Sequence, residues 1–301
     1  MPGFKNLVRP ASVQLLYDGS LEGMYSCIHT CIYGKLYPDN IVPEGRADPS
    51  LLEQRYVETD LYKASRVRGS IPHHISAEGL DLVETAFYSC LNHKEMQILR
   101  FLLYGYEVGG SACRALSHPD VSPLYKAARQ LGGECEKLLG FVRFSDYDGV
   151  LAAAISPKNF VLPYLAHHFV QRYSCEQFLI FDRVHKAALI YQDRSPRIVP
   201  LDDITFPEVS EREHQYRALW KQFYHTIAIK ERYNPKCRMT HMPKRYWENM
   251  TEMQELLYES DSPALPQPTG RAALPEAQWD IVQMDQALNT VRKGFLGMGN
   301  R

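Results

Sequence analysis

The chain lacks a surplus of charge of either sign. Its 301 residues contain 34 Lys and Arg against 35 Asp and Glu, which gives a net charge of −1. A uniformly basic coat for nucleic acid is therefore excluded, and any phosphate contact must come from a local cluster of cations. Long apolar runs are absent too: no window approaches about 18 uninterrupted apolar residues, and the N-terminus has no signal-peptide stretch. We therefore expect no membrane span and a cytoplasmic location.

Common catalytic motifs are also missing. The sequence contains no GxxxxGK[ST] or GxGxxG phosphate loop, no HExxH, no CxxC pair and no GxSxG elbow. Seven irregularly spaced cysteines favour free thiols in a reducing compartment over disulfides. Cys27 and Cys31 begin like the CxxxCxxC motif of a radical-SAM cluster, but Gly34 stands at the third position. Both cysteines lie on an apolar helical stripe, so we predict core residues, no metal site and no cofactor.

Apolar residues make up 45% of the chain, which is enough to form a full hydrophobic core. Hydrophobic spacing and turn signals predict helices that begin at the capping residues Ser20, Ser76 and Ser210 and at an Asn92/Glu95 capping box. Further helices are expected over 58–68, 121–139 and 160–173, and a loop over 38–50. Strands are expected over 13–17, 141–145, 150–155, 177–184, 187–192 and 197–201.

This order of elements predicts an α+β fold, with a small antiparallel sheet of about five strands flanked by N-terminal and C-terminal helices. Residues 1–252 are expected to form one domain. Three prolines mark 253–274 as a linker. Residues 275–301 are expected to form a C-terminal amphipathic helix and tail, and the apolar stripe of that helix is Ile281, Met284, Leu288 and Val291.

One segment concentrates cations and aromatic residues. From Trp220 to Trp247 there are seven Lys and Arg and a single acid, Glu231, a net charge of +6. Cations suit phosphates, and exposed rings stack on unpaired bases with about 1–3 kcal/mol per base. Helical spacing assigns Trp220 and Phe223 to the core, whereas Asn234-Pro235 breaks the helix. We predict nucleic-acid contacts from Lys230, Arg232, Asn234, Lys236, Arg238, Lys244, Arg245, Tyr246 and Trp247. The alternative is a solvated surface over core aromatics.

A few polar side chains are candidates for chemistry. Asp18 and Glu22 are expected to lie near each other across the turn into the first helix, where two carboxylates could perform acid–base work or hold a metal. Asp182 stands inside a strand pattern, which is unusual for a carboxylate. His168 and Arg143 are candidates to assist it. The alternative is that these residues have structural roles. Asp18 suits a turn, and one histidine of the His167-His168 pair suits a helix cap or the core.

Several motifs occur together and in order: Tyr17-Asp18-Gly19-Ser20-Leu21-Glu22-Gly23, Thr59-Asp60-Leu61-Tyr62-Lys63-Ala64, Gly140-Phe141-Val142-Arg143-Phe144, Val161-Leu162-Pro163 with His168-Phe169, Ala228-Ile229-Lys230-Glu231-Arg232-Tyr233-Asn234-Pro235, and Met242-Pro243-Lys244-Arg245-Tyr246-Trp247. Over residues 12–250 the chain resembles a bacterial family of DNA-metabolism proteins without an established mechanism. Its members are typically encoded beside a radical-SAM protein and are sometimes fused to a uracil-DNA-glycosylase-type domain.

The resemblance implies a role in DNA repair or modification but carries over no catalytic residue. Leu139 stands where the family has Lys, which argues against a lysine nucleophile there, and His168 is the residue that matches the family's His-Phe pair. The leading hypothesis is a DNA-binding accessory to a radical-SAM partner. The alternatives are a glycosylase-like hydrolase that uses the carboxylates above, and a scaffold that binds an acidic protein. The sequence does not predict an oligomeric state.

Overall fold

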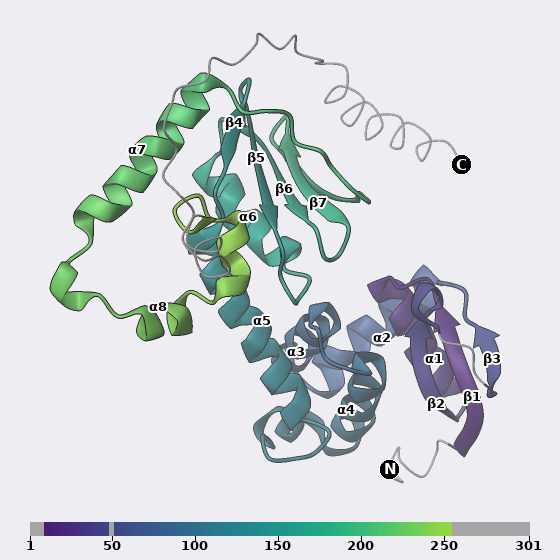
Figure 1. Ribbon diagram of the computed structural model, residues 1–301. Helices are drawn as coiled ribbons and strands as arrows, with labels where there is room; N and C mark the ends of the chain where they lie inside the picture. Colours follow the sequence, from purple (N-terminus) through teal and green to yellow (C-terminus); the bar gives the residue numbers. More distant parts are fainter. Residues whose placement is uncertain (1–8, 48–50, 255–301) are drawn as a thin grey trace. The chain divides into compact units, whose positions relative to one another are not determined.

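The computed structural model describes residues 9–47 and 51–254 of the chain (Figure 1). They form two compact units. The N-terminal unit comprises the described residues up to Gly140 together with Pro157–His168, and the C-terminal unit comprises Phe141–Ser156 and the described residues from Phe169 onward. The mixed α/β class matches the prediction. Almost all of the predicted linker and the whole predicted C-terminal helix lie outside the described residues, and a single domain over 1–252 stays a prediction.

The N-terminal unit opens with a three-stranded parallel sheet that the sequence did not predict. The strands β1 (Arg9–Tyr17), β2 (Leu36–Pro43) and β3 (Glu53–Tyr56) are arranged in the order β2-β1-β3, and α1 (Leu21–Tyr33) connects β1 to β2. A short turn of 3-10 helix, η2 (Glu44–Arg46), follows β2. The predicted loop over 38–50 is therefore wrong. Pro38 and Pro43 suggested a loop, but β2 is an edge strand, where prolines are tolerated.

Apolar residues of β1 and α1 form the centre of this unit. Leu15 and Tyr17 alternate along β1 and are fully buried. Cys27 and Cys31 are fully buried on α1, and burial raises the pKa of the Cys31 thiol to about 12. The prediction of core cysteines is confirmed, because both side chains belong to the buried apolar cluster of this unit.

The remaining helices of the N-terminal unit are α2 (Leu61–His74), α3 (Ala77–Tyr88), α4 (Lys94–Val108), η3 (Gly109–Arg114) and most of α5 (Ser122–Phe141). Asp60 and Ser76 cap α2 and α3 with their side chains. Contrary to prediction, α2 continues through Gly69 and Pro72, because Ile71 prolongs its buried stripe. The predicted capping box at α4 is also wrong. Glu95 is buried and accepts a hydrogen bond from the Tyr17 hydroxyl at 2.9 Å.

The C-terminal unit is built on a five-stranded sheet in the order β4-β5-β6-β7-β8. The predicted number of strands is confirmed, but the sheet is mixed, because β5 and β6 pair in parallel and α6 lies between them in the sequence. Asp148 and Gly149 join β4 to β5 with positive φ angles of 51° and 89°, as a tight hairpin requires. The element bounds are β4 (Ser145–Tyr147), β5 (Val150–Ile155), α6 (Leu162–Arg172), β6 (Gln177–Asp182), β7 (Ala187–Gln192) and β8 (Ser195–Pro200).

The sheet is followed by α7 (Glu211–Ile227), η4 (Lys230–Arg232), α8 (Pro235–His241) and η5 (Lys244–Asn249). Ser210 caps α7 as predicted and accepts a hydrogen bond from the Glu213 amide at 3.2 Å. Glu213 also accepts from the Asp146 amide, and Arg217 donates to Ser145 Oγ at 2.6 Å, so the start of α7 is attached to β4. No helix in the described ranges is long and apolar enough to cross a membrane.

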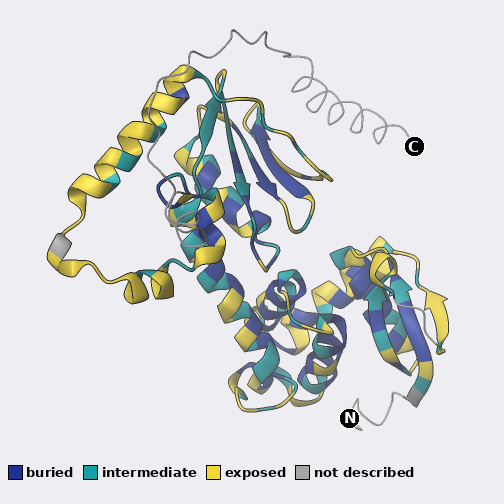
Figure 2. Cartoon of the chain, in the orientation of Figure 1, coloured by how far each residue is buried: buried dark blue, intermediate teal, exposed yellow. Residues whose placement is uncertain are grey.

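The predicted buried face of α7 is not buried. Trp220 and Phe223, assigned to the core by their spacing, are 39% and 51% exposed. Figure 2 shows α7 as an almost continuously exposed helix, in contrast to the buried strands β6 and β7. Helical spacing identified the apolar face correctly, but periodicity does not say what covers such a face.

Candidate nucleic-acid interface

The basic segment, residues 230–247, carries the cations for which nucleic-acid contact was predicted. It folds as two 3-10 helices, η4 and the first part of η5, with the short helix α8 between them in the sequence. Asn234 caps α8, accepting a hydrogen bond from the Cys237 amide at 3.0 Å, and Pro235 follows at the first helical position. The Asn234 side chain therefore has a structural role as the N-cap of α8. The Lys230 side chain lies outside the described part of the structure.

Tyr246 and Trp247 have a different role from the one expected. Both are only 3% exposed, and the Trp247 indole donates to the Met242 carbonyl oxygen at 2.9 Å. Rings buried in this way cannot stack on bases, so the expected stacking by these two residues is wrong. The aromatic ring that the basic segment does expose is Tyr233, at 70%.

The buried rings of Tyr246 and Trp247 make cation–π contacts with three cations of the basic segment. The guanidinium of Arg238 lies 5.3 Å from the Trp247 ring and 5.8 Å from that of Tyr233. The Lys244 ammonium lies 5.9 Å from the same Trp247 ring. Arg245 lies 4.5 Å above Tyr246 and also donates to its hydroxyl. Two successive aromatic residues thus gather three cations, and cation–π attraction of about 0.5–1 kcal/mol or more supports each contact.

The described acids leave three cations of the basic segment without an ion pair. Arg232, Lys236 and Lys244 are exposed, and no carboxylate in the described ranges forms an ion pair with any of them. The Nε of Arg238 is buried without a hydrogen-bond partner in the same part of the chain. The segment therefore keeps a positive charge on a protein whose total is −1, as a local phosphate site requires.

The carboxylate of Asp18 holds the turn from β1 into α1. It accepts from the Ser20 amide and hydroxyl at 2.9 and 2.6 Å and from the Thr59 hydroxyl at 2.7 Å. Burial raises its pKa, but these hydrogen bonds outweigh burial and the pKa lies below the ordinary value. A β-carbon at Gly23 would lie 2.2 Å from Asp18 Oδ1, so the turn requires glycine there.

Glu22 is exposed in the first turn of α1. No group of three or more His, Cys, Asp or Glu side chains in the described ranges is placed to hold a metal ion. The bonds described above are those of a structural turn, and they keep Asp18 ionised.

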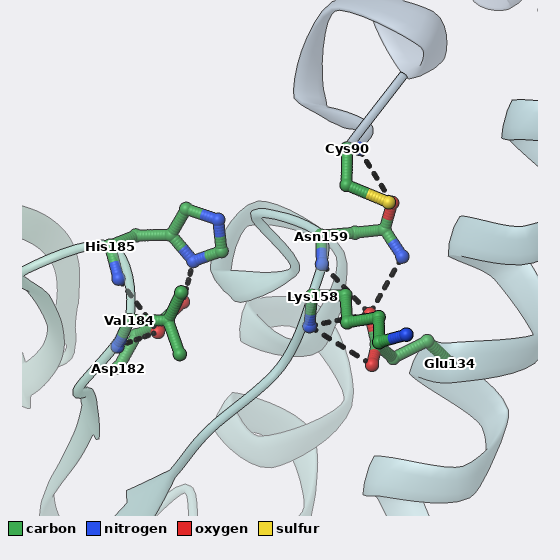
Figure 3. Close-up of polar contacts among 7 residues, drawn as sticks. All are labelled: Cys90, Glu134, Lys158, Asn159, Asp182, Val184 and His185. Carbon is green, nitrogen blue, oxygen red and sulfur yellow. Dashed lines mark hydrogen bonds and ion pairs between the residues drawn. The ribbon is translucent and has the colours of Figure 1, made fainter. Parts of the chain in front are cut away.

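The remaining candidate side chains also make structural contacts. Asp182 is fully buried and accepts from the Val184 amide at 3.0 Å, the His185 amide at 3.1 Å and His185 Nδ1 at 2.7 Å, which closes the β6–β7 hairpin (Figure 3). Arg143 donates to Glu252 at 2.6 Å. His168 is half-buried on α6. Asp18, Asp182 and Arg143 thus each make a structural contact of their own.

Sequence patterns gave no signal for one buried polar network in the N-terminal unit. The carboxylate of Glu134 on α5 is 3% exposed and accepts from the amides of Lys158 and Asn159 at 3.1 and 2.8 Å, and from the Asn159 side chain at 2.6 Å (Figure 3). Asn159 in turn accepts from the Cys90 amide at 2.9 Å. The partners are distant in sequence, so no local spacing could have predicted them.

The fold and the site together define a mixed α/β protein that carries an exposed cationic segment on buried aromatic rings. The sequence profile of a domain of unknown function, DUF4130, matches residues 92–252, and the chain belongs to that family. The matched range runs from just before α4 to just beyond η5 and includes the whole basic segment. Curated protein sequences give no significant match.

Proposed function

We propose that this chain is a DNA-binding accessory protein of DNA repair or modification, which holds a strand for a radical-SAM partner enzyme in the cytoplasm. The observation that carries the proposal is the convergence of Arg238 and Lys244 on Trp247. Exposed Lys236 and Arg232 on the adjoining turns extend the same cationic segment.

The physical argument rests on phosphate neutralisation. A protein cation that neutralises a DNA phosphate releases a condensed counterion, so the log of the affinity falls linearly with the log of the salt concentration. Buried aromatic rings reduce the freedom of the cations above them before a strand arrives, which lowers the entropic cost of binding. The exposed ring of Tyr233, beside Arg238, offers one stacking surface for an unpaired base.

The radical-SAM partner is proposed from the resemblance described for the motifs of this sequence. Such a partner would supply the chemistry, which agrees with the structural tasks of Asp18, Asp182 and Arg143. The division of labour therefore needs no cofactor on this chain.

The decisive experiment measures binding of the full chain to oligonucleotides of graded length across a salt titration. Lys236→Ala with Lys244→Ala should weaken binding to every sequence and reduce the slope of log affinity against log salt by about 2, roughly one for each lost phosphate contact. The matched control is Lys126→Ala with Arg129→Ala, which removes two exposed cations of α5. The control should leave affinity and slope unchanged.

The outcomes separate the three functions. Equal effects of the two double variants would overturn the assignment of the segment. Salt-dependent binding that does not increase with strand length would indicate an acidic protein as the partner. Cleavage or base release by the purified chain, lost in Asp182→Asn while binding is retained, would indicate a hydrolase. Capture of a radical-SAM protein together with DNA from native extracts would support the proposal.

A further inference from the structure

The helix α7 carries an apolar face that the described residues leave largely exposed. Five side chains at helical spacing (Tyr216, Leu219, Trp220, Phe223 and Ile227) are between 39% and 60% exposed. The described residues do not cover them, although Figure 2 shows well-buried strands in the same unit. We call these five side chains the α7 face.

The polar atoms on the α7 face already have partners, so the remaining surface is apolar. The Tyr216 hydroxyl accepts from Arg212, and the Trp220 indole donates to Glu252 at 3.0 Å. The rings of Trp220 and Phe223 pack together with their centroids 5.7 Å apart. A contiguous apolar stripe of this kind marks an interaction surface in a folded protein.

We propose that the α7 face is the docking site of this chain's own C-terminal segment, residues 275–294. The described chain reaches α7 at Glu252, which is hydrogen-bonded to Trp220, and residues 255–301 follow. Their sequence places Ile281, Met284, Leu288 and Val291 at intervals of 3, 4 and 3 residues.

The two stripes match in spacing and length. Tyr216, Trp220, Phe223 and Ile227 follow at intervals of 4, 3 and 4 residues, so both stripes have the repeat that lets two helices interlock. At 1.5 Å per helical residue, the stripes extend about 15 and 17 Å. The residues between 254 and 281 can extend up to about 90 Å, so chain length does not prevent docking.

Charge favours this occupant over a second copy of α7 or a DNA strand. Residues 214–227 of α7 carry Arg217, which is paired with Glu213, and Lys221, whereas residues 275–294 carry three acids, all before residue 286, against Arg292 and Lys293 at their end. Pairing α7 with a second α7 would oppose like charges. A DNA strand could use the aromatic rings but would leave Leu219 and Ile227 uncovered. A segment whose first part carries three acids beside an aliphatic stripe complements both the charge and the apolar character of the α7 face.

The test is hydrogen–deuterium exchange of the full chain. Met284→Asp with Leu288→Asp places charge on the proposed contact stripe. The matched control, Gln283→Asp with Gln286→Asp, adds the same charge on the opposite side of a helix with this repeat. Amides of α7 should be protected in the wild type and the control, and should exchange about ten-fold faster or more in the stripe variant. Amides of β6 and β7 report that the rest of the chain is folded.

Three results would overturn the proposal. Equal exchange of α7 in all three proteins would show that the segment does not cover it. Protection that rises with protein concentration would assign the α7 face to a contact between copies. Protection that appears only when DNA is added would assign it to the nucleic acid. Because none of these variants alters the basic segment, failure here leaves the proposed DNA-binding function untouched.

Discussion

Arg143 and Glu252 form an ion pair with a buried carboxylate in the C-terminal unit. The Glu252 side chain is 1% exposed, and it accepts from Arg143 at 2.6 Å and from Trp220 at 3.0 Å. Arg143→Leu would leave this carboxylate buried and unpaired, which should reduce the free energy of unfolding by about 3 kcal/mol. Chemical denaturation checks the value. The control is Arg183→Leu at an exposed pair with Glu248, where a loss below about 1 kcal/mol is expected.

The same pair makes stability depend on pH. Burial raises the pKa of Glu252, but the hydrogen bonds from Arg143 and Trp220 outweigh burial, and the net pKa lies below the ordinary value. A depressed carboxylate pKa adds stability above the ordinary pKa of about 4.3, and this stability is lost as pH falls through the folded-state pKa. The difference in unfolding free energy between wild type and Arg143→Leu should therefore shrink on acidification. A difference that grows at low pH would contradict this assignment.

Asp182 closes the β6–β7 hairpin through three accepted hydrogen bonds. Asp182→Asn keeps an acceptor for the two amides but loses the charged bond to His185 Nδ1, so the free energy of unfolding should fall by about 1–3 kcal/mol. DNA affinity should stay at the wild-type value. Thermal unfolding and a binding isotherm of the same sample check both parts. Unchanged stability with an altered isotherm would mean that Asp182 acts at the DNA site.

At the scale of elements, Glu134 attaches α5 to the stretch that begins at Lys158. Glu134→Gln removes the charge and, in either orientation of the amide, sets its NH₂ group against at least the Lys158 amide donor, so the free energy of unfolding should fall by about 1–3 kcal/mol. Glu136→Gln, two residues along the same helix at an exposed position, is the matched control and should change it by less than about 0.5 kcal/mol. Equal effects of the two variants would show that the buried network does not contribute to stability.

The elements that could be predicted were those with strong local signals. Ser20, Ser76 and Ser210 each cap a helix as expected, and the strands expected over 150–155 and 187–192 form with those bounds. Local signals failed where tertiary context decides. Pro38 and Pro43 do not prevent an edge strand, and β3 has four exposed residues and no apolar alternation to reveal it.

The candidate site was predicted only in part, because it too depends on tertiary context. Charge counting located the basic segment, but sequence gave no means of telling a buried ring from an exposed one. Trp220 and Trp247 exchange their expected roles: the first is exposed on α7, and the second is buried beneath Arg238 and Lys244. Both lie among cations and apolar residues, so local composition does not distinguish them. What differs is the rest of the described fold, which buries Trp247 and leaves Trp220 39% exposed.

At the scale of the whole molecule, charge is balanced overall and concentrated locally. The net charge is −1, whereas the stretch from Trp220 to Trp247 carries +6. Salt at physiological strength screens exposed charges beyond about 8 Å, so a phosphate senses the cations nearest to it rather than the sum over the chain. DNA affinity should therefore depend on the cations of the basic segment and not on the net charge of the chain.

This expectation can be tested by raising the net charge without touching the basic segment. Glu176→Gln with Glu208→Gln neutralises two exposed acids of the C-terminal unit and changes the net charge from −1 to +1. Fluorescence anisotropy at physiological salt should show DNA affinity unchanged within about two-fold, because neither acid belongs to the basic segment and exposed charges are screened by salt. Lys236→Ala with Lys244→Ala lowers the net charge by the same amount and should weaken binding at least about ten-fold. If the two double variants instead shift affinity by equal factors in opposite directions, the bulk charge governs binding and the basic segment has no special role.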